Sequence, residues 1–427
     1  MTAYYIKSLH IEKLWGYRNI NLSFNKDVNI IIGPNASGKT TILNLLRFIL
    51  SPDFIQLRDI EFEKVKIGFK SFDNNHTRTI VVVSKDTGYK YTVSKNVYEI
   101  PMDPMLREVN NLPARFRARA RLRSRNIELE LSLNEIAKTV WLPVSRRLPV
   151  SEEDEVRDTR QNLESVDVRL RELWEALKSY RLGLEAKLSL QYKGFERKVL
   201  SEILYSKEYD HVGSLSLRAT KPEDKQQLIR AFEVAGLLDS TMKERIDEHF
   251  LAADDAMRTF TSHSKKGQLE MDNVEVLDVL FILPLLRRTK SIVDYARNLE
   301  EDRKKLFSPL VKFENIVNDF LQPKIIKIDE SGALSIHSPN QPDIVPHMLS
   351  SGEKQILILL IQALVREDEP IIYVADEPEL SLHVKWQENL LSSLILLTKK
   401  IQIIVATHSP DIVGPFTDKI IDLGQIE

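Results

Sequence analysis

The chain has 427 residues, of which 43% are hydrophobic and 29% charged, and its formal net charge is −2. This is the composition of a globular protein, so a disordered chain is not expected. The length exceeds one ordinary hydrophobic core, so two or three lobes are expected. The small net charge excludes nucleic-acid binding through overall charge, and the lack of cysteine excludes disulfides, thiol nucleophiles and Cys-ligated metals. No signal-peptide pattern opens the chain and every apolar run is shorter than the ~20 residues of a membrane span, so we expect a cytoplasmic protein without membrane contact.

The first predicted elements are short strands that lead to a glycine-rich loop. Apolar and polar residues alternate over residues 6–24, which predicts two half-buried strands, and Asp27–Ile32 is a continuous apolar strand. Thr40–Leu50 places apolar residues on one face and is predicted to be a helix. Further along, turn residues separate three segments that we expect to form a small antiparallel sheet: Val65–Phe72, Thr79–Ser84 and Tyr89–Ser94.

A phosphate-binding pattern lies between that apolar strand and that helix. Its residues are Gly33, Pro34, Asn35, Ala36, Ser37, Gly38, Lys39, Thr40 and Thr41. The backbone N–H groups of such a loop, with the positive end of the following helix, can bind the α- and β-phosphates of ATP. Lys39 can then reach the β- and γ-phosphate oxygens, and the Thr40 hydroxyl can ligate Mg²⁺. A plain glycine loop is the alternative, but the flanking strand and helix favour a site for ATP and Mg²⁺.

A run of arginines follows the expected antiparallel sheet. Arginine occupies every second position from Arg115 to Arg125, and an extended segment would place all of these side chains on one face. Such a basic stripe can contact the phosphates of nucleic acid or an acidic protein. A solvated connector, or pairing with the acidic segment Glu152–Glu155 of a neighbouring copy, is the alternative. The sequence leaves this choice open.

The middle of the chain has the pattern of a helical arm. A capping box at Ser151–Asp154 begins a long helix, so a domain boundary is expected near residue 150. Apolar residues of the first limb are spaced alternately by three and four: Leu163, Val166, Leu170, Leu173, Leu177, Tyr180 and Leu184. Those of the returning limb recur every seven residues: Ile292, Leu299, Leu306, Phe313 and Phe320. This predicts an antiparallel coiled-coil arm over residues 151–322 with a small helical tip, and Ser308-Pro309 is expected to break or restart the returning helix.

After the arm the chain returns to an α/β pattern. Lys324–Asp329 and Ala333–His337 are expected to form a hairpin. Helices then alternate with the apolar strands Ile371–Val374, Ile401–Ala406 and Lys419–Leu423, which is typical of a parallel sheet. We therefore expect residues 1–150 and 323–427 to form the two lobes of one α/β domain.

Charged and polar residues follow two of these strands. Asp376 and Glu377 come at the end of the strand that begins at Ile371, where a parallel sheet places its ligands. Asp376 is predicted to hold magnesium and Glu377 to act as general base toward the attacking water. His408 follows the next strand and is predicted to bond the γ-phosphate. The alternatives are a helix-capping acid pair and a structural histidine.

A second anion site is predicted at the start of another helix. Ser350, Ser351, Gly352 and Glu353 stand before the apolar residues Gln355–Val365, so amide groups and the Ser351 hydroxyl face outward at a positive helix end. A Ser-Gly helix start is common and is the alternative. Its position shortly before the strand of Asp376 favours the anion site.

These motifs together resemble the head of an ABC-type ATPase, in the branch shared by SMC proteins, RecF and the overcoming-lysogenization-defect ATPases. By this resemblance, Gly33–Thr40 is similar to Walker A, Leu349–Glu353 to the signature, Asp376 and Glu377 to Walker B, and His408 to the switch histidine. Glu379–His383 is similar to the D-loop. The resemblance implies a mixed-sheet head split by an inserted arm, and a homo-oligomer built on head-to-head dimers that sandwich ATP.

Two departures from this family matter. No glutamine is identifiable as the Q-loop residue, and Ser145–Arg147 occupies roughly that region. The sequence also reaches Glu427 without the TOPRIM nuclease that overcoming-lysogenization-defect proteins carry, so we expect the effector to be a separate protein.

The layout resembles the stand-alone ATPase subunits of anti-phage systems such as PARIS and Septu. We therefore predict an ATP hydrolase that senses a phage-derived trigger and controls a separate effector, with a nuclease as the leading candidate. The alternative is a RecF-like DNA-repair ATPase that binds duplex DNA through the arm and the arginine run. A transport ATPase head is disfavoured, because no membrane-coupling feature is identifiable in the sequence.

Overall fold

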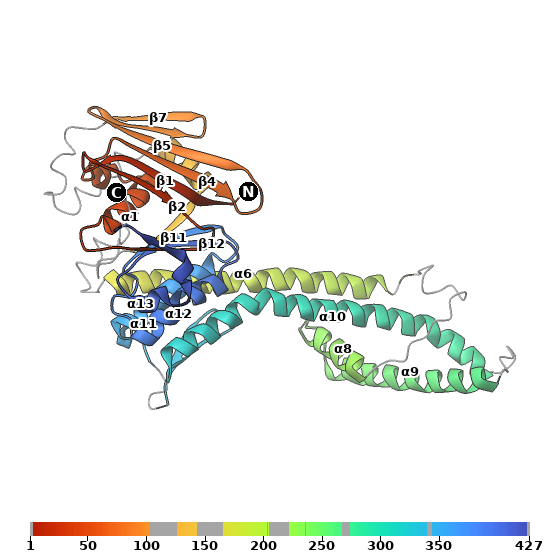
Figure 1. The fold of residues 1–427 in the computed structure, drawn as a ribbon. Helices are drawn as coiled ribbons and strands as arrows, with labels where there is room; N and C mark the ends of the chain where they lie inside the picture. The colour runs from red at the N-terminus through yellow and green to blue at the C-terminus, as the bar shows by residue number, and fades with distance from the viewer. Residues whose placement is uncertain are drawn as a thin grey trace. The chain divides into compact units, whose positions relative to one another are not determined.

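The computed structural model describes residues 3–101, 126–142, 165–202, 204, 222–234, 236–266, 274–339 and 344–424 (Figure 1). The chain forms two compact units, Met1–Ser179 with Pro309–Glu427, and Tyr180–Ser308. Four features of the sequence analysis lie outside the described residues: the Arg115–Arg125 run, the Ser145–Arg147 segment, the boundary near residue 150 and the capping box at Ser151. Within the described part of the chain, no helix is long and apolar enough to cross a membrane.

The first unit contains an antiparallel sheet of six strands. In spatial order they are β2 (Arg18–Ser23), β1 (Tyr4–Leu14), β4 (Lys64–Ser71), β5 (Thr77–Lys85), β6 (Gly88–Val93) and β7 (Asn96–Pro101). Every second residue of β4 is buried, which matches the two-residue period of a strand with one face toward a core. The sequence predicted the strands at β4, β5 and β6 as a separate small sheet, whereas β1 joins β4 and makes one larger sheet.

The same unit contains a parallel sheet of five strands. Their spatial order is β13 (Ile420–Asp422), β3 (Val28–Ile32), β12 (Ile401–Ala406), β11 (Ile371–Asp376) and β8 (Lys138–Leu142). Asp376 is paired with Ala406, and Ala406 with Ile31, so β3, β11 and β12 end at the same edge. The residues that follow these three strands are therefore brought together, although they come from opposite ends of the chain.

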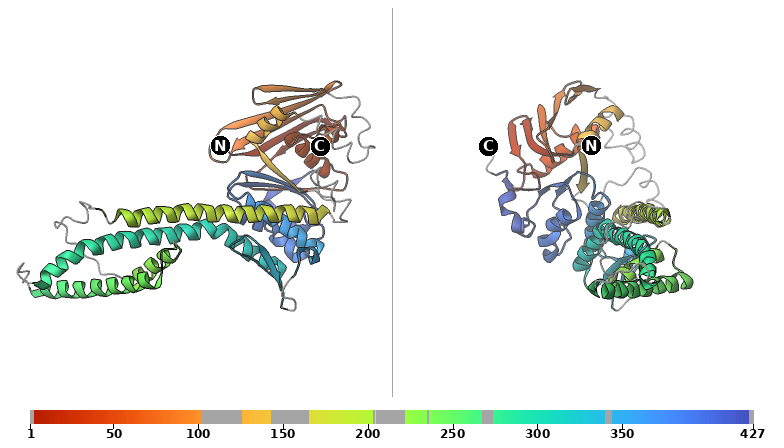
Figure 2. Two further views of the ribbon diagram at one scale, coloured as in Figure 1. Left: turned by 180° about the vertical axis from the view of Figure 1, so that it is seen from behind. Right: turned by 90° about the vertical axis from the view of Figure 1, so that its right-hand side faces the viewer.

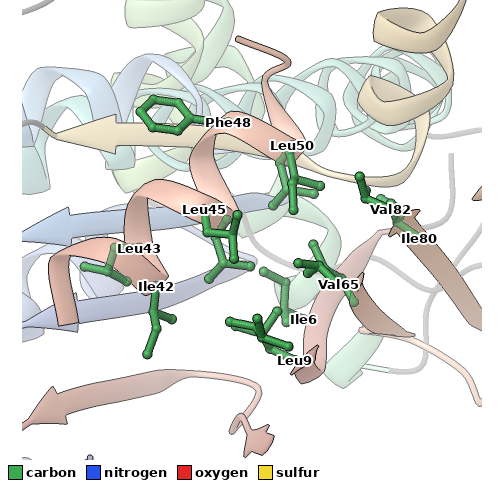
Figure 3. Close-up of a cluster of buried hydrophobic side chains, with 14 of the residues drawn as sticks. Ile6, Leu9, Ile42, Leu43, Leu45, Phe48, Leu50, Val65, Ile80 and Val82 are labelled. Atoms are coloured by element: carbon green, nitrogen blue, oxygen red, sulfur yellow. The ribbon is translucent and has the colours of Figure 1, made fainter. Parts of the chain in front are cut away.

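Helix α1 (Lys39–Leu50) packs between the two sheets (Figure 3). Its buried side chains share one hydrophobic cluster with residues of both sheets. The antiparallel sheet contributes Ile6, Leu9 and Val65, and the parallel sheet contributes Val374 and Ile404. Other helices of this unit include α2 (Phe54–Leu57), α4 (Ile127–Ile136), α11 (Ser351–Val365), α12 (Val384–Leu397) and α13 (Pro410–Val413), with the 3₁₀ turns η2 (Pro346–Met348) and η3 (Gly414–Lys419). Burial of α1 on both sides fixes the loop that precedes it.

Buried amide side chains connect the two sheets. Gln402 on β12 is fully buried; its Nε2 donates to the carbonyl oxygens of Ile6 (2.7 Å) and Asn25 (2.8 Å), and its Oε1 accepts from the Ile6 N–H (2.8 Å). Asn29 on β3 likewise bonds the backbone of Asn25 and Ile403. Because buried polar groups are costly unless paired, these bonds specify how β1 meets β12.

The second unit is helical. It contains the later part of α6 (Ser165–Ser201), α8 (Pro222–Val234), α9 (Ser240–Lys266) and the earlier part of α10 (Val274–Leu321). Arg181 lies over Phe307, Phe195 stacks on Tyr295, and the Ser291 hydroxyl donates to Glu202 (3.0 Å). Within this unit α6 and α10 are therefore antiparallel and lie side by side (Figure 2). A buried cluster joins them to α8 and α9: Leu188, Tyr192, Phe195, Leu228, Ala231, Phe232, Ile246, Phe250, Val293, Ala296 and Leu299.

One expectation about the returning helix was wrong. Ser308-Pro309 was expected to break it, but α10 is continuous from Val274 to Leu321. Proline removes one helix N–H, the partner of the carbonyl four residues earlier. That carbonyl belongs to Lys305, which is exposed, so water can bond it. The predicted hairpin after α10 is present as β9 (Ile325–Ile328) and β10 (Leu334–His337).

Candidate active site

The loop between β3 and α1 folds around its own lysine. Lys39 is 7% exposed, and its Nζ donates to the carbonyl oxygens of Gly33 (2.9 Å) and Pro34 (3.1 Å). Gly38 precedes the helix with φ 97°, a left-handed conformation that glycine adopts without strain. The ammonium group of Lys39 is therefore held against the loop, beside the N-terminus of α1.

Two residues that sequence reasoning missed support this loop from the β1–β2 turn. A Cβ atom on Gly38 would lie 2.8 Å from the Trp15 ring, so the indole packs directly on the loop. The Arg18 guanidinium donates to the Ser37 carbonyl (2.8 Å) and to the Leu423 carbonyl (3.2 Å). Trp15 and the exposed Tyr17 flank one glycine in a tight turn, a visible signal, but nothing in the spacing says that this turn meets the loop. An aromatic ring beside a phosphate loop is suited to stack on a nucleotide base.

Asp376 and Thr40 form the centre of the site. Asp376 ends β11 and is 4% exposed. Burial raises the pKa of Asp376, and Glu377 and Glu379 raise it further, while the nearby Thr40 side chain and the charge of Lys39 oppose the shift. A hydroxyl and a carboxylate thus lie together beside a lysine. Magnesium commonly takes few protein ligands and completes its shell with phosphate oxygens and water, so these two groups fit it.

Glu377 has an unusual backbone. Its φ is 46°, in the left-handed region that non-glycine residues rarely adopt, and its N–H donates to the Ala406 carbonyl (2.8 Å). The hydrogen bond to β12 holds this conformation. Strained backbone of this kind concentrates at functional sites, where the surrounding structure fixes it. The position therefore agrees with a role at the strand ends.

The loop after β11 also contacts the loop after β12. The Oε1 atom of Glu379 accepts hydrogen bonds from the Thr407 hydroxyl and from the His408 N–H (3.2 Å). Thr407 is buried, whereas the His408 side chain is exposed. His408 thus follows β12 as predicted, and its main-chain N–H is bonded by Glu379, the first residue of the D-loop-like segment Glu379–His383.

The predicted second anion site is a capped helix start. The Ser350 hydroxyl accepts from the Glu353 N–H (3.3 Å), and the Glu353 carboxylate accepts from the Ser350 N–H (2.8 Å) and from Lys324 Nζ (2.6 Å). Burial raises the pKa of Glu353, but the bonds from Lys324 and Ser350 outweigh it and hold the pKa below its usual value. The Glu353 carboxylate therefore caps the N-terminus of α11, whereas Ser351, in the same turn, is exposed.

Gly352 packs this helix start onto the loop after β11. A Cβ atom on Gly352 would lie 2.5 Å from the Ser381 carbonyl oxygen, closer than real Cβ atoms come to any neighbour. The described contacts thus form two sets. One places Lys39 and Thr40 near Asp376; the other places residues 350–353 against the loop that also carries Glu379.

Comparison with protein families shows the family to which the chain belongs. A family profile described as an AAA ATPase domain matches residues 5–413. The chain belongs to the AAA_15 family of AAA ATPase domains. Membership confirms, at a general level, the predicted enzyme class of a nucleotide-binding ATPase.

This AAA_15 protein is also similar to named relatives. It is 22% identical over 437 residues to the Retron Ec83 probable ATPase of Escherichia coli, a match that spans 95% of this chain and 69% of the relative. It is 33% identical over 82 residues to the Septu protein PtuA of Bacillus thuringiensis, which spans 18% and 21% of the two chains. A solved Smc head domain from Pyrococcus furiosus with an extended coiled coil, bound to the C-terminal domain of ScpA, superposes with a TM-score of 0.42 at 15% identity, covering 98% of this chain and 93% of that one. The predicted resemblance to ATPases of this kind is confirmed by the family profile and by relatives that include a retron ATPase and a Septu protein.

Proposed function

We propose that the protein hydrolyses ATP at the loop Gly33–Thr40, with magnesium held by Thr40 and Asp376. The observation that carries this proposal is the buried carboxylate of Asp376 at the end of β11, close enough to Thr40 and Lys39 of the loop for both to lower its pKa. Magnesium would supply charge neutralisation for the phosphates. Residues 33–41 bind the phosphates through backbone N–H groups and Lys39, and Glu377 takes the proton of the attacking water.

The signature completes the site of a second copy of the chain, and His408 completes the site of its own head. Ser351 is exposed at a helix N-terminus, where Ser350, Gly352 and Glu353 shape the turn. Three large apolar side chains close to it in the sequence and along the contacting loop are exposed: Met348 (56%), Leu380 (41%) and Val384 (52%). Such a surface suits a head-to-head dimer in which Ser351 of one head meets the γ-phosphate held by the other. His408 then bonds the γ-phosphate from its own head.

The lobe and arm boundaries also remain part of this proposal. Residues 1–150 and 323–427 form the two lobes of the head, and residues 151–322 form the inserted coiled-coil arm. The antiparallel contacts of α6 with α10 and the buried cluster with α8 and α9 support an arm with a helical tip. Such an arm can hold a protein partner.

The biological role follows from the relatives. Similarity to a retron ATPase and to a Septu protein supports a cytoplasmic ATPase of anti-phage defence that responds to a phage-derived trigger and controls a separate effector such as a nuclease. In the alternative role, DNA repair, the arm and the Arg115–Arg125 run bind duplex DNA. A salt titration separates the two, because binding through phosphate contacts weakens log-linearly with salt concentration.

Two substitutions test the reaction. Lys39→Ala removes the loop's cation, so both ATP binding and turnover should fall at least about 100-fold, whereas Glu377→Gln should keep binding and lose turnover by a similar factor. Lys26→Ala, at an exposed lysine of the same unit, is the matched control. Binding is measured with a fluorescent ATP analogue and turnover by phosphate release. Normal turnover in either site variant contradicts the assignment.

A further inference from the structure

Glu379 is the third acid after β11, and its two oxygens have different surroundings. Oε1 accepts hydrogen bonds from the Thr407 hydroxyl and the His408 N–H. Oε2 is buried and has no hydrogen-bond partner among the described residues. The carboxylate also raises the pKa of Asp376 through its charge, so it lies near the proposed metal ligand. One oxygen of this carboxylate is therefore bonded to the loop of His408, while the other lies buried near the remaining acids of the site.

These bonds belong to a closed ring that joins the two loops. Thr407 Oγ1 accepts from the Ser409 N–H (2.9 Å), and Ser409 Oγ donates to Gln387 Oε1 (2.6 Å). Gln387 Nε2 donates to the Leu382 carbonyl (2.9 Å), and the Leu382 N–H donates to the Glu379 carbonyl (2.9 Å). The ring thus runs from the loop after β11 to the loop after β12 and back, so neither loop can shift alone without breaking a bond.

The same loop supports the signature. Gly352 packs on the Ser381 carbonyl, and Ser381 precedes Leu382 of the ring. Gln355 of the signature helix also donates to the Pro378 carbonyl (3.4 Å), next to Glu379. A displacement of the signature start would therefore move the loop after β11, whose Glu379 is hydrogen-bonded to the His408 N–H.

We infer that Glu379 is a positioning residue, which sets the place of His408 relative to Asp376 and Glu377 and links it to the signature. The inference rests on the proposed function, in which His408 bonds the γ-phosphate. Glu379 acts through a hydrogen-bond acceptor, its Oε1 atom, and not through proton transfer. Nucleotide affinity, set by the loop Gly33–Thr40, does not depend on it.

Three variants separate this role from a catalytic one. Glu379→Ala removes the acceptor and should lower kcat about 10- to 100-fold, the scale expected when a reacting group is misplaced by about 1 Å, with ATP affinity unchanged within about twofold. Glu379→Gln keeps an oxygen at this place and should restore most of kcat. Thr407→Val removes one donor; its effect should not add to that of Glu379→Ala, because both break the same bond. Glu388→Ala, at an exposed acid on α12, is the control.

Hydrogen exchange gives a readout that does not depend on turnover. Peptides covering residues 404–413 should exchange faster in Glu379→Ala than in wild type or in Glu388→Ala, because the His408 N–H loses its acceptor. Unchanged exchange in these peptides overturns the inference, and this measurement can be made even on an inactive protein. An inactive wild-type protein would contradict only the proposed function. Glu379→Gln as slow as Glu379→Ala also overturns it, since the charge would then be needed. If Glu379→Ala does not fold, the Gln and Thr407→Val variants decide by the same two measurements.

Discussion

The phosphate loop and the signature start are both glycine-containing turns at the N-terminus of a helix, yet the first N–H groups of the two helices are capped differently. Gly38, which has no side chain, caps α1, so the first N–H groups of that helix face outward and can bind phosphates. At α11 the capping box of Ser350 and Glu353 already bonds two N–H groups, and the Glu353 carboxylate already meets the positive helix end. The N–H groups of the first turn can thus bind several phosphates. The second turn has mainly the exposed Ser351 with which to contact a phosphate bound by another head.

Mixing two inactive variants tests this division with the largest expected effect. Lys39→Ala should inactivate the phosphate loop, and Ser351→Arg should block the signature while leaving the loop intact. Each alone should be inactive. A 1:1 mixture with free exchange should recover about a quarter of the wild-type activity, because about half of the dimers are hybrids and one of the two interfaces in each hybrid joins an intact loop to an intact signature. Steady-state phosphate release over a range of mixing ratios measures this. No recovery, with both variants folded and exchanging subunits, would mean that each chain turns over alone.

Substitution of Gly352 tests how closely the signature start must lie against its loop. Gly352→Ala would bring a Cβ to 2.5 Å from the Ser381 carbonyl, so the helix start must move. We expect kcat to fall about tenfold or more, with ATP affinity nearly unchanged, because the phosphate loop is untouched. The matched control is Gly183→Ala, also in a helix, where a Cβ meets nothing within 4 Å. Equal kcat values for the two variants would show that the packing is not needed.

Trp15 provides a smaller test on the phosphate-loop side. Trp15→Ala removes the ring that packs on Gly38 and is available to a base, so ATP affinity should fall about tenfold, within the range for base stacking on aromatic side chains. Trp15→Phe should keep most of the affinity. Tyr17→Ala, in the same turn, is the comparison, and titration with the fluorescent ATP analogue is the measurement. An unchanged affinity in Trp15→Ala would remove the base-stacking role.

The smallest effect concerns the stability of the nucleotide-free protein. Burial and two neighbouring acids raise the pKa of Asp376, so ionisation is less favourable in the folded state than in the unfolded state. Its contribution to stability is complete below the unfolded pKa and is lost as the pH rises through the raised folded value. Asp376→Asn should therefore raise the melting temperature by about 2 °C at pH 7 and by less as the pH falls toward 4. A lower melting temperature at pH 7 would contradict this cause.

What the sequence predicts well is local. The loop Gly33–Thr40 needs only one strand, one turn and one helix, all adjacent, and Asp376 needs only a continuous apolar strand before it. The order of the five parallel strands could not be predicted, because it depends on pairing between β3 and strands from the far end of the chain. The contacts of Trp15 with Gly38 and of Glu379 with His408 were missed for the same reason. The effect of Pro309 was predicted wrongly, because a helix tolerates a proline when water can bond the carbonyl that loses its N–H partner, and the sequence does not show whether that carbonyl is exposed.

The position of β3 in the parallel sheet has a consequence for synthesis of the protein. Its neighbours are β12 and β13, so residues near 30 must wait for residues beyond 400 before they can pair. At about 5–20 residues per second, the ribosome takes roughly 20–75 s to translate the intervening chain. During that time the apolar strand before Lys39 belongs to an unfinished nascent chain and is a target for chaperones. A transcript truncated before Ile401 therefore yields a polypeptide that carries the phosphate-loop sequence but leaves its strand without a partner on either side, so ATP binding arises only after the strands beyond residue 400 have been made.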